Sequence, residues 1–281
     1  MSLPRVFLLT LLAMLAFAAN SLLCRAALHG STIDAASFTA LRIGSGAAML
    51  WLIVRLRDGP RRTAGNWSSA FALFGYAATF SFAYVSLTAA TGALLLFGAV
   101  QATMIGAGLV RGERLSRLQA LGLACALAGL VGLLLPGLSA PPLRGALLMV
   151  AAGVGWGVYS LRGKGAGDPL RVTAGNFLRA LPFAAALSVA TLPWARLDLT
   201  GAALAMASGG LASGVGYAIW YTALPALRVT TAATVQLTVP VIAAVGGLVL
   251  LGEAPTPRFV IAAVAILGGI ALVVRPRRRS S

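Results

Sequence analysis

Ten long apolar runs constrain this chain more than any other feature of its sequence. A helix needs roughly 20 apolar residues to cross the ~30 Å hydrocarbon core of a bilayer, and each run approaches that length. Hydrophobic residues make up 59% of the chain and charged residues 10%, too little polar surface for a soluble globule. The apolar residues are continuous and do not alternate, which excludes the strands of an outer-membrane barrel. We therefore predict an all-α polytopic membrane protein with ten transmembrane helices, approximately 6–28, 35–56, 69–87, 91–110, 118–135, 143–161, 172–192, 200–222, 230–251 and 259–274.

A repeat at half the chain length predicts two related halves. Glu113 recurs as Glu253 and Gly129 recurs as Gly269, an offset of 140 residues in a chain of 281. Such internal symmetry is typical of a duplicated gene. Each half has five spans, an odd number, so the second half must enter the membrane from the opposite side. We predict two inverted five-helix repeats, 1–137 and 138–281, which meet in a turn rich in Pro and Gly.

Basic residues are distributed unevenly over the two sides of the predicted bundle. If the amino terminus is cytoplasmic, sixteen of the 22 Lys and Arg residues fall inside, several of them in the carboxy-terminal tail. Two, Arg42 and Arg179, lie deep within spans, and four fall on the outer side, in loops or near span ends: Arg25, Arg144, Arg196 and Arg258. The positive-inside rule then predicts a multi-pass protein of the bacterial inner membrane with both termini in the cytoplasm. The net charge of +16 is explained by this orientation, so we expect no nucleic-acid partner.

Side chains that could build an enzyme site or a metal site are scarce. The six acids lie in loops or at span ends, and the single histidine, His29, lies in an outer loop. Cys24 and Cys125 fall within spans, where neither a disulfide framework nor a four-ligand metal site can form. We therefore predict no enzyme activity, no metal and no cofactor. Glu113 and Glu253 each lie in a tight turn, where we expect them to cap the following helix or to pair locally.

Aromatic and amide side chains recur at helical spacing and mark candidate substrate-binding faces. One set, Tyr76, Phe80 and Tyr84, follows an i, i+4, i+8 pattern, and a second, Phe97, Gln101 and Met104, follows i, i+4, i+7. Further candidates are Asn20, Trp156, Tyr159, Tyr217, Trp220 and Gln236. A face of rings with occasional amides suits a flat, weakly polar solute. The alternative is that these rings only pack helices together or form the interfacial aromatic belt.

Two arginines and one proline lie inside predicted spans. Arg42 and Arg179 are each about eight residues from a span end, roughly 12 Å deep at 1.5 Å per residue. Such a side chain can reach the interface or bind backbone carbonyls, or it can bind a carboxylate or phosphate of a solute. Pro240 removes one backbone hydrogen bond within the ninth span and is a candidate hinge.

The sequence resembles the EamA-like branch of the drug/metabolite transporter superfamily over its whole length. Each half closes with a Gly-Glu turn before its last helix, at 112–113 and 252–253, and Pro240 and Trp156-Gly157 also match the pattern. The first half departs from it, with Val100 where Pro is expected and Phe17-Ala18 where Trp-Gly is expected. The resemblance implies a ten-helix transporter fold.

From these features we predict a transporter that exports small amphipathic metabolites, chiefly aromatic and neutral amino acids. It would work by alternating access, as a facilitator or an exchanger. The alternatives are an exchanger of organic anions or phosphorylated metabolites that uses Arg42 and Arg179, and a lipid-handling membrane protein without a solute pathway. The expected partners are the lipid bilayer and the solute, and the protein is expected to be a monomer.

Overall fold

Helices account for all of the regular secondary structure in the part of the chain that is described. The computed structural model describes residues 1–59, 64–112, 114–137, 140–163, 166–227 and 229–274. In chain order the elements are α1 (Leu3–Gly30), α2 (Ala35–Asp58), α3 (Trp67–Tyr84), α4 (Ala89–Val110), α5 (Arg117–Leu134), α6 (Leu143–Gly163), α7 (Pro169–Ala190), η1 (Leu192–Trp194), α8 (Leu199–Met206), η2 (Ala207–Val215), α9 (Gly216–Ala223), η3 (Leu224–Ala226), α10 (Val229–Gln236), α11 (Thr238–Leu251) and α12 (Pro257–Val274).

Polar residues between the apolar runs determine where the helices begin. The side chains of Asp34, Asn66, Thr88, Ser116 and Asp168 each accept a hydrogen bond from a backbone N–H in the first turn of the following helix. These caps satisfy donors that the helix itself leaves free. Two of these caps are the acids Asp34 and Asp168, whereas the sequence predicted either capping or local pairing for the two glutamates. Glu113 lies outside the described residues, and Glu253 has a different partner.

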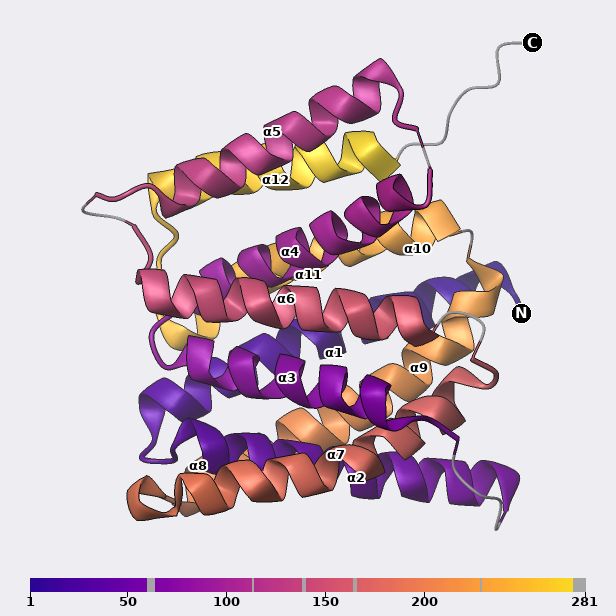
Figure 1. Ribbon diagram of the computed structural model, residues 1–281, viewed down its shortest axis with the longest axis vertical. Helices are drawn as coiled ribbons and strands as arrows, with labels where there is room; N and C mark the ends of the chain where they lie inside the picture. Colours follow the sequence, from indigo (N-terminus) through magenta and orange to yellow (C-terminus); the bar gives the residue numbers. More distant parts are fainter. Residues whose placement is uncertain (60–63, 113, 138–139, 164–165, 228, 275–281) are drawn as a thin grey trace.

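The structure confirms the prediction of an all-α polytopic membrane protein. Nine helical segments within the described ranges are long and apolar enough to cross a membrane. The remaining predicted span is α3, an 18-residue helix whose Ser, Thr and Tyr residues make it less apolar. It packs against α6 and α7 in the same bundle (Figure 1). Its length, about 27 Å at 1.5 Å per residue, approaches the thickness of the hydrocarbon core.

The eighth and ninth spans are not regular α-helices over their whole length. The eighth consists of α8, a nine-residue π-helical segment η2, and α9. Glycines in η2 allow α2 to approach closely, since a Cβ at Gly209 would overlap the carbonyl oxygen of Arg42. The ninth span is divided at Leu237 into α10 and α11, three residues before the buried Pro240.

The helices of the two halves are interleaved about an approximate two-fold relation. Helix α5 packs against α12, α2 against α7, and α4 against α11, so that equivalent helices of the two halves meet. The pairing of α3 with α6 is matched by that of α1 with α8, η2 and α9. Helix α1 begins and α12 ends at the same end of the bundle, which we call the terminal end (Figure 1). This arrangement is that of two inverted five-helix repeats.

Candidate functional site

A cavity of about 480 Å³ lies among helices from both halves of the chain. Its walls come from α1, α3, α4, α6, α7, η2, α9 and α10, so no single half of the bundle encloses it. We call it the central cavity. Eleven of the twelve residues predicted to bind substrate line it: Asn20, Tyr76, Phe80, Phe97, Gln101, Met104, Trp156, Tyr159, Tyr217, Trp220 and Gln236.

Tyr84 is the predicted residue that does not line the central cavity. It is the last residue of α3 and lies beyond Phe80, with the two ring centroids 4.8 Å apart. Its hydroxyl donates to the carbonyl of Ala89 at 3.3 Å. The aromatic face of α3 therefore continues past the cavity to the opposite end of the bundle.

Aromatic rings form a continuous wall around Trp156. The Trp156 ring stacks on Tyr217 with centroids 5.4 Å apart and an interplanar angle of 16°, and on Tyr159 at 5.3 Å and 30°. Tyr76 contacts the same indole from the opposite half of the chain, at 5.0 Å. Rings from three helices are thus already arranged to receive a flat group.

Several lining residues were not among the predicted substrate-binding set. Phe17 packs against Tyr217 and Trp220, with centroids 5.8 Å and 6.0 Å away. One sequence feature points to Phe17: it lies three residues before Asn20, just as Trp156 lies three residues before Tyr159. Thr173 was missed as well, because a lone threonine in an apolar helix carries little signal.

The two intramembrane arginines do not line the central cavity. Arg42 is only 2% exposed and lies behind the cavity wall, where its Nη2 donates to Tyr76 Oη at 2.7 Å. The guanidinium also lies 4.6 Å from the centroid of the Phe80 ring. Arg179 instead binds backbone, because its Nη1 donates to the carbonyls of Ala64 and Gly175, each at 2.9 Å.

The central cavity extends to the terminal end of the bundle. Its lining includes Gly163 at the end of α6, Pro169 at the start of α7, and Leu224 in η3. The end of α6, the start of α7 and η3 all lie at the end of the bundle where α1 begins (Figure 1).

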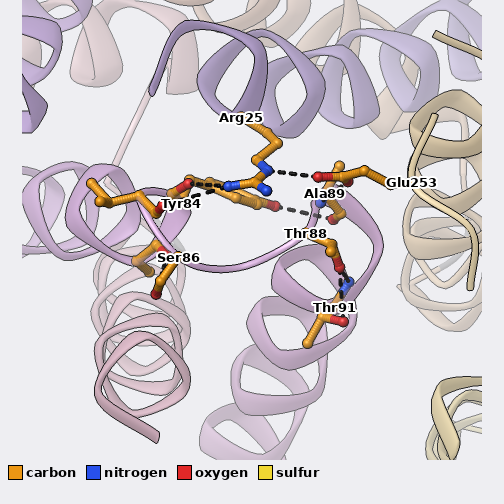
Figure 2. Close-up of polar contacts among 9 residues, drawn as sticks. Arg25, Tyr84, Ser86, Thr88, Ala89, Thr91 and Glu253 are labelled. Atoms are coloured by element: carbon orange, nitrogen blue, oxygen red, sulfur yellow. Dashed lines mark hydrogen bonds and ion pairs between the residues drawn. The ribbon is translucent and has the colours of Figure 1, made fainter. Parts of the chain in front are cut away.

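Toward the opposite end, a largely buried polar cluster surrounds Arg25 in α1 (Figure 2), and Arg25 does not line the central cavity. Arg25 Nε donates to Glu253 Oε1 at 2.6 Å, and Arg25 Nη1 donates to the Tyr84 carbonyl at 3.2 Å. Glu253 Oε2 accepts from the backbone N–H of Ala89 at 2.7 Å. We call these four residues the Arg25 cluster. It ties α1 to the α3–α4 turn and to the turn between α11 and α12, so Glu253 pairs across the fold and not locally.

The described residues contain no group of three or more His, Cys, Asp or Glu side chains that could hold a metal ion. None of the described residues that line the central cavity carries a charge at neutral pH. The chemistry that this lining offers is stacking, hydrogen bonding by amides and hydroxyls, and exclusion of water.

Comparison with known proteins identifies a family. The model of the EamA-like transporter family matches twice, over residues 5–135 and 143–275. The chain is 61% identical over 274 residues to a Pseudomonas aeruginosa protein named "Uncharacterized protein PA1977", covering 97% of this chain and 96% of that one. A crystal structure of a protein that is 23% identical has a similar fold, with a TM-score of 0.67 over 97% of this chain and 98% of that one.

Proposed function

The chain belongs to the EamA-like transporter family and is a membrane transporter of small solutes, and we propose that it exports aromatic and neutral amino acids from the cytoplasm. The narrower resemblance of its sequence to the aromatic amino acid exporter YddG favours this substrate class. The protein lies in the inner membrane with both termini in the cytoplasm, as the distribution of its basic residues predicts.

The observation that carries the proposal is the aromatic, uncharged lining of the central cavity. Stacked rings around Trp156 suit an aromatic side chain, and the amides of Asn20, Gln101 and Gln236 suit the polar groups of an amino acid. A volume of about 480 Å³ is within the range of small-molecule sites. An uncharged lining favours a solute whose own charges cancel, because an unpaired phosphate would lose its hydration without compensation.

Alternating access is supported by the difference between the two ends of the bundle. The cavity extends to the terminal end, whereas the Arg25 cluster closes the other. With cytoplasmic termini, this is the state in which an exporter binds its solute. Opening the outer end then requires the ion pair of Arg25 and Glu253 to separate.

Exchange of organic anions through Arg42 and Arg179 has less support. The Nη1 group of Arg179 is occupied by two carbonyls, and Arg42 lies behind Tyr76. Neither arginine is among the described residues that line the central cavity.

Counterflow in proteoliposomes tests the proposal. We expect uptake of labelled phenylalanine, tryptophan and leucine, and Trp156→Ala should raise the KM for phenylalanine about tenfold because a stacking surface is lost. Phe7→Ala removes a ring that is 70% exposed on α1 and serves as the control, with unchanged transport. Failure of the wild-type protein to exchange any of these solutes would overturn the proposal and favour a lipid-handling role.

A further inference from the structure

The hydroxyl of Tyr76 has both of its acceptor positions occupied. It accepts from Arg42 Nη2 at 2.7 Å and from Asn20 Nδ2 at 3.3 Å. The Asn20 amide is held in this orientation by Ser208, whose hydroxyl donates to Asn20 Oδ1 at 2.6 Å. A tyrosine hydroxyl has two lone pairs and one proton, so only its proton remains. No hydrogen bond among the described residues uses that proton, and Tyr76 lines the central cavity.

The charge of Arg42 is also incompletely compensated. The side chain is 2% exposed, and its Nη1 has no hydrogen-bond partner among the described atoms. No salt bridge of the described residues includes it. Its nearest compensation is the Tyr76 hydroxyl and the faces of two rings, Tyr76 at 5.1 Å and Phe80 at 4.6 Å. A buried cation in this position favours an anionic group close to it.

These two features are joined through one hydrogen bond. A guanidinium that donates to a hydroxyl oxygen withdraws electron density from it and makes its O–H a stronger donor. The Tyr76 ring also lies 5.0 Å from the Trp156 ring, so the donor is adjacent to the stacking surface. A solute that places its ring on Trp156 therefore has a polar anchor at Tyr76 within the same cavity.

We propose that the Tyr76 hydroxyl donates a hydrogen bond to the carboxylate of the transported solute, with Arg42 behind it as the positioning residue and counter-charge. The site thereby takes zwitterionic aromatic carboxylates and discriminates against the matching amides and amines. This inference rests on the proposed function and specifies the substrate class of the same cavity. Tyr76 contacts the solute, whereas Arg42 acts through Tyr76.

The experiment compares the KM values for phenylalanine and phenylalanine amide in counterflow. In the wild type we expect phenylalanine to be preferred by about 10- to 100-fold, the range of one hydrogen bond to a charged group. Tyr76→Phe should remove most of this preference while leaving the KM for the amide nearly unchanged. Tyr84→Phe removes a hydroxyl from the same helix that does not line the cavity, and it should keep the preference.

Arg42 is tested by its effect on the same ratio, which a purely structural role would not alter. Arg42→Gln should lower the preference, Arg42→Lys should partly restore it, and Arg42→Gln added to Tyr76→Phe should cause no further loss. If Tyr76→Phe prefers phenylalanine over the amide as strongly as the wild type does, the inference is overturned. This test does not depend on whether Arg42→Gln folds. Wild-type protein that transports neither compound would instead contradict the proposed function itself.

Discussion

Replacing Glu253 with glutamine should open the closed end of the bundle. The carboxylate of Glu253 accepts from Arg25 Nε at 2.6 Å through one oxygen and from the Ala89 N–H at 2.7 Å through the other (Figure 2). Glutamine has nearly the same size, but it has no charge and only one acceptor oxygen. The substitution therefore removes the ion pair while the turn between α11 and α12 keeps its shape.

The magnitude follows from the burial of this pair. The Arg25 and Glu253 side chains are 9% and 11% exposed, so water compensates little for a lost partner. Breaking a buried ion pair costs about 3 kcal/mol at the low end of its usual range, and Arg25 keeps the Tyr84 carbonyl as an acceptor. A change of about 3 kcal/mol corresponds to a shift of roughly 100-fold in the ratio of closed to open states.

Cys24 provides a built-in reporter of this shift. It precedes Arg25 in α1 and is 0% exposed in the closed arrangement, whereas the other cysteine, Cys125, is exposed on α5. In a Cys125→Ser background, an impermeant thiol reagent added outside right-side-out vesicles should therefore modify Cys24 slowly. Glu253→Gln should raise that rate by up to about 100-fold.

Two comparisons separate opening from general loosening. Arg57→Gln removes an exposed ion pair with Asp168 and should leave the labelling rate of Cys24 unchanged. Arg25→Gln should raise the rate as Glu253→Gln does, and the double substitution should add little to either. Equal labelling rates in Glu253→Gln and in the parent protein would refute the assignment of this ion pair as the outer closure.

Three further outcomes are expected. Gly209→Val should lower the free energy of unfolding by about 1–3 kcal/mol, measured as a lower Tm in detergent, because the added side chain would overlap the Arg42 backbone. The control Gly210→Ala meets only ordinary van der Waals contacts and should be tolerated. Reporter fusions after Gly59 should read cytoplasmic and those after Gly30 external, and the reverse result would invalidate the assigned orientation. A pH gradient of either sign should not change the final accumulation of a neutral amino acid at clamped membrane potential, because no described lining residue is an acid or a histidine. Accumulation abolished by a protonophore would contradict this and direct attention to Glu253.

Local periodicity was enough to predict which helix faces meet at the central cavity. The i, i+4 spacing of Tyr76 and Phe80 and the spacing of Phe97 and Gln101 place each pair on one face of a regular helix, and the structure puts both faces on the same cavity. The same pattern failed at Tyr84. Eight residues span roughly 12 Å of helix, so the aromatic face extends past the cavity into the closed end.

The contacts that close the bundle could not be predicted in the same way. Arg25 and Glu253 are 228 positions apart, and nothing near either residue in the sequence identifies the other. The sequence around Glu253 therefore predicts only a local role, capping of the following helix or pairing with a nearby residue, as is common for acids in turns. The sequence places Arg42 deep in its span but does not identify its partner, because the contact with Tyr76 depends on how α2 and α3 face each other.

One difference between the two halves can be traced from sequence to structure. Pro240 and Val100 occupy equivalent positions, 140 residues apart. A proline cannot donate to the carbonyl four residues before it, and its ring clashes with that group, which here belongs to Gln236. Helix α10 ends at Gln236, whereas α4 continues unbroken through Val100. Because Gln236 lines the central cavity, the break presents the end of a helix to the solute on one side only. The duplicated halves can therefore share a fold and still contribute unequally to binding and to movement.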